Sequence, residues 1–259
     1  MNENKTAVVK SADRALSVLE YLAREPSPRS LADIAAELGI PRSSVFGLLH
    51  NLTGRGWLTA YDGAVTTYRI GPQALTVGSA YIAGDDIVRR SEAVIDELSA
   101  ALGETVHLGV LDGSEIVYLA KRDARHSLRL VSSVGFRLPA YATALGKMLL
   151  SDLSGAQRDW ILSLPRRRIT AKTLVDGDAL LADLEETRAR GYAIDDEEST
   201  EGVRCFAVPL GTHAPHTHAI SCSVPVARLD DVFQDRVVQE LRRAAAAYAQ
   251  IESTFGSEG

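Results

Sequence analysis

The segment from Arg42 to Arg55 carries polar side chains at spacings that suit contact with nucleic acid. Its hydroxyl, amide and imidazole groups can hydrogen-bond to phosphates and base edges, and its arginines can pair with phosphates. The 24 residues from Leu38 to Tyr61 contain no Asp or Glu, although an even spread of the 34 acidic residues would place about three there. A surface that faces phosphates needs this absence of carboxylates, so the pattern predicts a DNA-binding face. Its candidate residues are Arg42, Ser43, Ser44, Phe46, Gly47, His50, Asn51 and Arg55.

Two short helices joined by a tight turn are needed to present these side chains together. Ser30 can cap a first helix that begins at Leu31, and Gly39 can end it in the left-handed conformation. Ser43 or Ser44 can cap the second helix. That helix has an apolar stripe made of Val45, Leu48, Leu49 and Leu52. The spacing is typical of a helix-turn-helix, and the alternative is an ordinary pair of packed helices that does not contact DNA.

Flanking segments extend this motif to a winged helix-turn-helix domain over residues 10–71. A helix is predicted from Ser11 to Ala23. Its apolar face consists of Ala15, Leu16, Leu19, Leu22 and Ala23. Two β-prone runs flank Asp62-Gly63, a dipeptide that favours hairpin turns, and this hairpin would form the wing.

A helix within residues 72–85 is expected to link this domain to the rest of the chain. Gly71-Pro72 ends the hairpin, and Gln73–Ala83 has helical periodicity. The apolar side of this helix is broad for a helix exposed to water, and packing against the same helix of a second subunit would explain it. The alternative is that the helix packs on its own domain.

The chain from residue 86 to residue 256 predicts an α+β domain with an antiparallel sheet. Strands are expected on both sides of Asp112-Gly113, at Ser127–Val131, and at 192–198, 204–210 and 219–226. Helices are expected at 85–102, 156–163, 178–190 and 229–253, with another inside 138–153. His107 lies on a strand, where it faces either a pocket or the core.

The length of 259 residues suggests one large or two ordinary domains, and the composition is that of a globular protein. Residues 1–84 contain 8 Lys+Arg and 7 Asp+Glu, or +1, whereas residues 85–259 contain 20 and 27, or −7, so the negative net charge of −6 comes from the second part. A DNA-binding first domain is compatible with this distribution. No apolar run could span a bilayer and the first residues do not resemble a signal peptide, so we expect a cytoplasmic protein with no membrane partner. Cys205 and Cys222 are then expected to be reduced.

Two further groups of residues invite a metal-binding or enzymatic interpretation. Asp195–Glu198 is a run of four acids, but such a run more often marks a solvated strand end. The three histidines His213, His216 and His218 lie among turn-forming residues, which favours a hairpin loop over a metal site. No nucleophile elbow, phosphate loop, zinc-finger spacing or His-Glu-x-x-His motif occurs, so we predict no enzyme, no metal and no cofactor.

Six blocks along the chain resemble, in order, the IclR family of bacterial transcriptional regulators. The blocks are SADRALSVLEYL, LADIAAELGIPRSSVFGLLHNLTGRGWL, YRIGPQALTVGSAY, RLPAYATALGKMLL, RGYAIDDEESTEGVRCFAVPL and AISCSVPVAR. The resemblance implies an N-terminal winged helix-turn-helix joined by a linker helix to a GAF-like α/β effector-binding domain with an antiparallel sheet. It also implies homodimers, often paired into dimers of dimers, that bind palindromic operators in double-stranded DNA.

The resemblance further implies where a small-molecule effector binds. In known members the ligand meets the loop before a Gly-Lys pair, the first acid of an acidic run, a cysteine, and two alternating serines on the last strand. The corresponding residues here are Ala144, Leu145, Asp195, Cys205, Ser221 and Ser223. Leu145 departs from carboxylate-binding members with a small residue at this place. It favours an aromatic or otherwise less polar acid at least as much as a glyoxylate-like or pyruvate-like effector.

The leading hypothesis is therefore a ligand-responsive regulator of a catabolic operon, in which each subunit of a dimer places residues 43–51 in a major groove. The rival hypothesis is a metabolite-processing enzyme or sensor in which the winged helix serves only for assembly. An acidic recognition face would favour the rival, and the absence of acids there favours the regulator.

Overall fold

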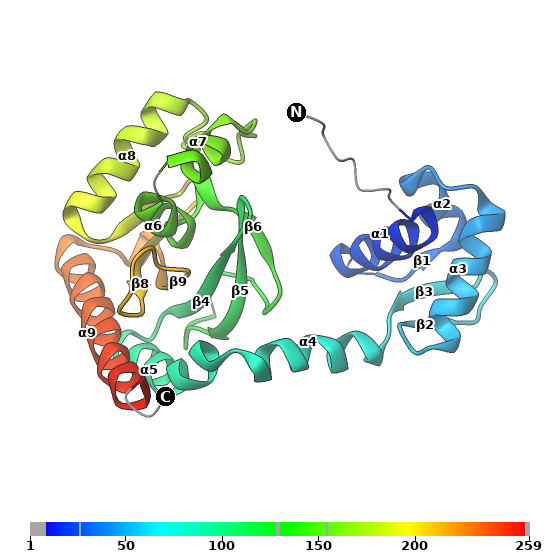
Figure 1. The fold of residues 1–259 in the computed structure, drawn as a ribbon, viewed down its shortest axis with the longest axis horizontal. Helices are drawn as coiled ribbons and strands as arrows, with labels where there is room; N and C mark the ends of the chain where they lie inside the picture. The colour runs from blue at the N-terminus through cyan, green and yellow to red at the C-terminus, as the bar shows by residue number, and fades with distance from the viewer. Residues whose placement is uncertain (1–8, 26, 128–129, 154, 257–259) are drawn as a thin grey trace. The chain divides into compact units, whose positions relative to one another are not determined.

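The structure is a computed structural model that describes residues 9–25, 27–127, 130–153 and 155–256 (Figure 1). It divides into two compact units, residues 1–84 and residues 85–259. The predicted linker of residues 72–85 corresponds to one helix at the end of the first unit. Within the described ranges, no helix is both long enough and apolar enough to cross a membrane.

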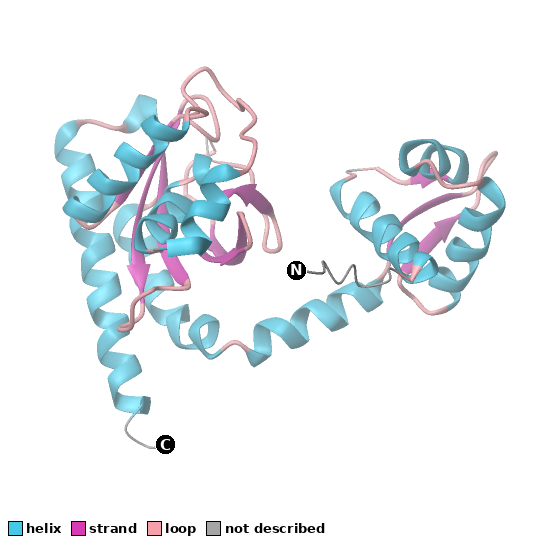
Figure 2. Cartoon of the chain, turned by 45° about the horizontal axis from the view of Figure 1, so that its top comes forward, coloured by secondary structure: helices cyan, strands magenta, loops and turns pink. Residues whose placement is uncertain are grey.

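The first unit is a winged helix-turn-helix, as the sequence predicts (Figure 2). Its elements are α1 (Lys10–Arg24), β1 (Arg29–Ser30), α2 (Leu31–Leu38), α3 (Arg42–Gly54), β2 (Leu58–Tyr61), β3 (Thr67–Ile70) and α4 (Pro72–Gly84). The strands form an antiparallel sheet in the order β1-β3-β2, and β2 and β3 are the wing. The core of the unit is built from Val18, Leu22, Ile34, Val45, Leu49 and Leu58.

Local signals explain where α2 begins and ends. The Ser30 hydroxyl accepts a hydrogen bond from the amide of Asp33 at 3.2 Å, and the Asp33 carboxylate accepts one from the amide of Ser30 at 3.0 Å. This reciprocal capping box satisfies two amides that the helix leaves unpaired. Gly39 ends α2 with a φ of 62°, a left-handed conformation that glycine adopts without a steric penalty. Both predictions for α2 are confirmed.

Two predictions for neighbouring helices are wrong. Neither Ser43 nor Ser44 caps α3, because the helix begins at Arg42 and its N-cap is Pro41. The proline already fixes a backbone angle suited to a helix start, so both serines fall within the first turn. On α1 the residue at the centre of the core is Val18, whereas Leu16 is 59% exposed. The buried face of α1 therefore lies further around the helix than predicted.

The second unit is an α+β domain built on one antiparallel sheet of six strands in the order β6-β5-β4-β9-β8-β7. Its strands are β4 (Thr105–Asp112), β5 (Glu115–Arg122), β6 (Arg137–Pro139), β7 (Ala193–Asp196), β8 (Val203–Leu210) and β9 (His218–Pro225). Its α-helices are α5 (Asp86–Leu102), α6 (Ala144–Asp152), α7 (Gly155–Ser163), α8 (Gly177–Arg190) and α9 (Asp231–Gly256), with short 3-10 turns at Ala140–Ala142 and Val226–Arg228. Helices α5 and α9 pack together on one face of the sheet, and α6 covers the other face with α8 beside it (Figure 1).

One predicted strand is replaced by another segment. The strand expected at Ser127–Val131 includes residues 128–129, which lie outside the described residues, and residues 130–131 are not in a strand. The strand that pairs with β5 is instead β6, where Ile116 lies opposite Leu138. β6 leads through a 3-10 turn into α6, so this edge of the sheet determines where α6 begins.

Candidate DNA-binding face and effector pocket

Helix α3 buries one side and exposes the side predicted to contact DNA. Val45, Leu49 and Leu52 are buried against the core of the first unit. On the outer side, Ser43, Phe46, Gly47, His50 and Asn51 are exposed, and Ser44 is half-buried. Arg42 and Arg55 are exposed at the two ends of the helix. Seven of the eight candidate residues are therefore exposed, and nucleic acid could contact them.

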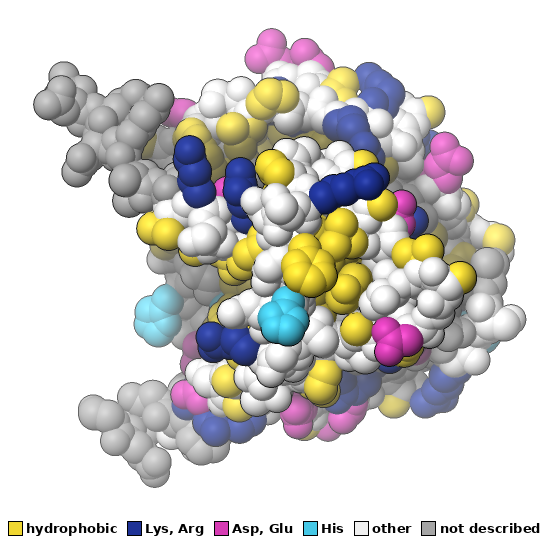
Figure 3. Space-filling model, turned by 90° about the vertical axis from the view of Figure 1, so that its right-hand side faces the viewer, with side chains coloured by type: hydrophobic (Ala, Val, Ile, Leu, Met, Phe, Trp, Pro, Cys, Tyr) yellow, Lys and Arg dark blue, Asp and Glu magenta, His cyan; other side chains and the backbone are white. Residues whose placement is uncertain are grey.

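The charge of the surrounding surface suits a polyanion. Figure 3 shows Lys and Arg side chains around exposed hydrophobic side chains and a histidine on this side of the molecule. On the wing, the guanidinium of Arg69 lies over the ring of Tyr61, 5.1 Å from its centroid. Such cationic groups beside an acid-free helix can pair with phosphates.

Helix α4 is apolar yet uncovered within this chain. None of its residues is buried, and Leu75, Val77 and Tyr81 are 76%, 49% and 58% exposed. The alternative that α4 packs on its own domain therefore finds no support in the described residues. An apolar helix left in water in this way is typical of a surface that a partner covers.

The six effector-site candidates of the second unit line one cavity. They are Ala144 and Leu145 at the start of α6, Asp195 on β7, Cys205 on β8, and Ser221 and Ser223 on β9. Tyr118, Thr143 and Ser199 complete the lining. About 10 Å³ is open to the centre of a water molecule, which is room for about one water.

The strand register explains why residues so distant in sequence meet. Asp195 lies opposite Cys205, and Cys205 lies opposite Ser223 on the next strand. Opposed residues of antiparallel strands point to the same face of a sheet, and residues two apart do so as well. Ser221 and Ser223 therefore face the pocket together. The Cys205 thiol also donates a hydrogen bond to the Ser223 hydroxyl, with an Sγ–Oγ distance of 3.2 Å.

Two glycines let α6 approach the sheet. A Cβ atom at Gly146 would clash with the backbone of Ala140, so only glycine allows the first turn of α6 to pass over the preceding 3-10 turn. A Cβ atom at Gly109 on β4 would lie 3.0 Å from Cδ1 of Leu145. Thr143 caps α6 by accepting a hydrogen bond from the amide of Gly146 at 3.0 Å. The amino end of α6, where helices bind anions, therefore lies at the pocket.

Asp195 is the ionisable centre of the cavity. Its carboxylate accepts hydrogen bonds from the amide of Glu198 at 2.7 Å, and from the amide and hydroxyl of Ser199 at 3.2 and 2.6 Å. Burial outweighs these hydrogen bonds and raises the pKa of Asp195 to about 6. Burial and the nearby Asp195 also raise the pKa of the Cys205 thiol, so this thiol is protonated at neutral pH.

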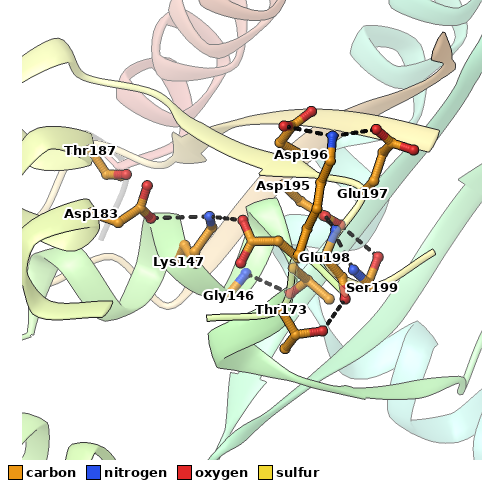
Figure 4. A network of polar contacts seen from close by, with 12 residues as sticks. Gly146, Lys147, Thr173, Asp183, Thr187, Asp195, Asp196, Glu197, Glu198 and Ser199 are labelled. Carbon is orange, nitrogen blue, oxygen red and sulfur yellow. Dashed lines mark hydrogen bonds and ion pairs between the residues drawn. The ribbon is translucent and has the colours of Figure 1, made fainter. Parts of the chain in front are cut away.

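The acidic run is not simply a solvated strand end, as the sequence suggested. Only the two middle residues of the run are at the surface, where Asp196 and Glu197 pair with Lys172. Glu198 is buried, and its carboxylate pairs with the buried Lys147 of α6 at 2.5 Å (Figure 4). Lys147 also lies 3.0 Å from the Asp183 carboxylate of α8. The four acids therefore have three different environments: the first lines the pocket, the middle two are at the surface, and the last is in a buried ion pair.

The histidine-rich segment is a hairpin loop, as predicted. Leu210 pairs with His218 where β8 and β9 are joined. The Nδ1 atom of His216 lies 2.6 Å from the Asp152 carboxylate, whereas Nε2 of His218 lies 3.3 Å from the Asp85 carboxylate. His216 and His218 thus have separate carboxylate partners, and Nδ1 of His213 lies 2.9 Å from the hydroxyl of Thr212. Across the part of the chain that the structure describes, no group of three His, Cys, Asp or Glu residues could hold a metal ion.

His107 lies on the pocket face of the sheet, beside the lining residue Tyr118, but it does not itself line the cavity. It is buried on β4 opposite Ser221, its ring stacks on Tyr118 with centroids 4.2 Å apart, and its Nε2 lies 2.7 Å from the Ser132 hydroxyl. Burial lowers the pKa of His107 to about 3, so the ring is neutral. Tyr118 is a lining residue that the sequence did not identify, and no motif marks it. The sequence did carry a signal that could have identified Thr143, because threonine directly before a helix is a common N-cap.

Comparisons with known proteins give a consistent result over most of the chain. The family profile for the C-terminal domain of the bacterial transcriptional regulator IclR matches residues 79–250, and the profile for the IclR helix-turn-helix domain matches residues 11–60. The chain is 32% identical over 245 residues to the HTH-type transcriptional regulator XynR of Escherichia coli strain K12, covering 94% of this chain and 97% of that one.

Two further relatives agree with these matches. The HTH-type transcriptional regulator BhcR of Paracoccus denitrificans strain Pd 1222 is 33% identical over 251 residues, covering 93% of this chain and 88% of its own. A crystal structure from Rhodococcus sp. RHA1, described as that of a transcriptional regulator, aligns with a TM-score of 0.81 and 27% identity. The alignment covers 96% of this chain and 100% of that chain.

Proposed function

The chain belongs to the IclR family of bacterial transcriptional regulators, and from this premise we propose that it binds a palindromic operator as a homodimer and responds to a small organic acid. The genes that it controls would be those of a catabolic operon, and it would act in the cytoplasm, where bacterial DNA lies. Because the family consists of transcriptional regulators, the enzymatic alternative is not proposed.

The DNA contact proposed here is made by α3 in a major groove. The exposed residues from Ser43 to Asn51 would face base edges, while Arg42 and Arg55 would pair with phosphates at the two ends of the helix. This face is short and carries few charges, so one copy would bind weakly. Two copies on a palindrome would double the contacts, which supports a dimer.

The dimer proposed here forms through α4. The exposed Leu75 and Tyr81 could be buried against the same helix of a second chain, and burying one such side chain contributes about 1.5–3 kcal/mol. Gly78 lies between them, and apart from its chain neighbours and the backbone of its own helix, no described atom lies within 4 Å of a Cβ built there. A glycine at this place would let the two helices approach closely. A pair of such dimers on one operator is compatible with this arrangement.

The effector proposed here binds in the cavity beside α6. The observation that carries this proposal is that six candidates from the start of α6, β7, β8 and β9 converge on one buried space. The amino end of α6 and the hydroxyls of Ser221 and Ser223 could hold a carboxylate. Leu145 and Tyr118 form an apolar wall that suits a hydrocarbon or aromatic portion. Asp195 would favour a hydrogen-bond donor on the ligand and disfavour a second carboxylate.

The test of the effector site is ligand-induced stabilisation of the full chain. Melting temperatures would be measured with a panel of aliphatic, hydroxylated and aromatic monocarboxylic acids. We expect stabilisation by at least one acid, loss of this shift in the Ser221→Ala/Ser223→Ala double variant, and retention of it in Ser253→Ala, which removes an exposed hydroxyl on α9. An unchanged shift in the double variant would place the ligand elsewhere.

The test of DNA binding is a mobility shift with the intergenic DNA beside the gene for this protein. We expect a retarded complex at low salt whose amount changes when the stabilising acid is added. Absence of a complex with all neighbouring intergenic fragments would count against the proposal.

A further inference from the structure

We propose that Phe46 and Gly47 are among the sequence-reading residues of α3, and that together they recognise the 5-methyl group of a thymine in each operator half-site. This inference rests on the proposed DNA binding and adds to it the base that is read. Two features of α3 that the fold of this chain does not explain point to it.

Gly47 is the first feature, because the protein itself does not need a glycine there. It lies in the interior of α3, where glycine is less favourable than alanine. Its φ is not positive, and apart from its chain neighbours and the backbone of its own helix, no described atom lies within 4 Å of a Cβ built at this position. Gly146, in contrast, could not carry a Cβ without meeting the backbone of Ala140. The open space beside Gly47 is therefore available to a group that approaches α3 from outside the chain.

Phe46 is the second feature, because a large apolar side chain faces water on a helix that already has a complete buried side. It is 63% exposed, whereas its neighbour Val45 is fully buried. A phenyl ring cannot hydrogen-bond to a phosphate or to a base edge. The apolar group that the major groove offers is the methyl group of thymine. A helix without a side chain at the adjacent position can place this ring close to the groove floor.

The other exposed side chains of α3 limit what else it can read. From Ser43 to Gly54 the helix has no Arg or Lys, so its interior lacks the side chains that most often read guanine. Asn51 lies one turn after Gly47 on the same side, and its amide suits the N6 and N7 atoms of adenine. The basic residues Arg42 and Arg55 lie at the two ends, which fits the phosphates that border a groove. The residues of α3 together favour half-sites centred on A·T pairs.

The first experiment removes the methyl group without changing base pairing. Duplexes bound by the full chain would be selected from a random pool, and each thymine of the selected site would then be replaced by deoxyuridine. At one thymine of each half-site we expect affinity to fall about fourfold, the ratio that corresponds to one buried methyl group. Phe46→Ala should bind more weakly and lose this sensitivity. Leu16→Ala, which removes an equally exposed apolar side chain from α1, should behave as the parent chain does.

The second experiment separates folding from reading at Gly47. We expect Gly47→Ala to raise the melting temperature of the first unit by about 4–8 °C and to weaken binding to the selected site by about tenfold. A variant that is not more stable would show that the fold needs this glycine, and a variant with undiminished affinity would show that DNA does not approach it. Either result, or equal deoxyuridine effects in the parent chain and Phe46→Ala, overturns the inference. A selection that enriches no duplex would instead overturn the proposed DNA binding.

Discussion

The Nζ atom of Lys147 lies 2.5 Å from Oε1 of Glu198, and the two side chains are only 1% and 6% exposed. Lys147 belongs to α6, which begins at the cavity, and Glu198 belongs to the turn that follows β7 and Asp195. The pair therefore joins two walls of the cavity on the side remote from the ligand space. Asp183, 3.0 Å from the same Nζ, extends this contact to α8.

Breaking this pair should strongly destabilise the second unit. Lys147→Met would leave two carboxylates without their cation, and we expect the free energy of unfolding to fall by about 3–5 kcal/mol. The Lys147→Met/Glu198→Gln double variant should lose less than the sum of the two single losses, because it removes both members of the pair. Urea denaturation followed by circular dichroism would measure these values, and strictly additive losses would show that the two side chains are not coupled.

The buried Asp195 should make stability depend on pH. Burial raises the pKa of Asp195 to about 6 from an ordinary value near 3.8. The folded chain therefore holds this proton more tightly than the unfolded chain, and the contribution of Asp195 to stability falls as pH rises from about 4 to 6. The whole change amounts to roughly 3 kcal/mol. The free energy of unfolding of Asp195→Asn should lack this pH-dependent contribution when it is measured from pH 4 to 7. Parallel profiles of unfolding free energy against pH for the two chains would contradict the prediction.

Filling the space above Gly109 should push Leu145 into the cavity. In Gly109→Ala the new methyl would lie 2.9 Å from Cγ2 of Ile116 and 3.0 Å from Cδ1 of Leu145. We expect a loss of stability of about 1–3 kcal/mol and weaker binding of the acid that stabilises the parent chain. Calorimetric titration would measure the binding. Unchanged affinity would mean that the ligand does not contact this side of Leu145.

Arg42 and Asn51 should affect DNA binding in different ways. Arg42→Ala removes a phosphate contact, so it should weaken binding to all sequences alike and reduce the slope of log K against log salt by about one. Asn51→Ala should narrow the difference in affinity between operator DNA and random DNA. It should leave the slope of log K against log salt unchanged. Titrations at several salt concentrations would test both predictions. A slope that changes in Asn51→Ala but not in Arg42→Ala would show that Asn51 contacts phosphate and Arg42 does not.

The exposed apolar side of α4 should control oligomeric state. Leu75→Glu places a charge where we propose that the two subunits meet, so we expect a monomer in sedimentation experiments at concentrations where we expect the parent chain to be a dimer. Gln73→Glu adds the same charge on the same helix and serves as the control. A Leu75→Glu chain that remains dimeric would move the interface away from α4.

The sequence predicts most of the helix-turn-helix because local chemistry decides it. The capping box at Ser30 and the left-handed Gly39 act through neighbouring residues only. The buried side of α1 was harder to predict, since Leu16 and Val18 are both apolar and only packing against α2 and the wing selects Val18. The start of α3 was misplaced because Pro41 can begin a helix without a serine cap.

In the pocket, alternation along a strand is enough to place Ser221 and Ser223 on one face. Tyr118 was not predictable in this way. The register of β4 against β5 shifts between Leu108 and Gly109, and this irregularity decides which β5 residue faces the cavity. Ser199 reaches the cavity through a tight turn in which Glu197 has a φ of 61°, a conformation that no sequence pattern marked.

The small volume of the cavity has a thermodynamic consequence. The cavity as it stands has room for about one water, so we expect the proposed effector to bind to an expanded conformation of the second unit. Its measured affinity is then its affinity for the expanded form, reduced in proportion to how rarely that form is populated. A substitution that favours the expanded form of the second unit would therefore tighten binding of the acid even if the substituted residue does not contact the acid. It would also shift the regulator toward its ligand-bound behaviour in the absence of ligand.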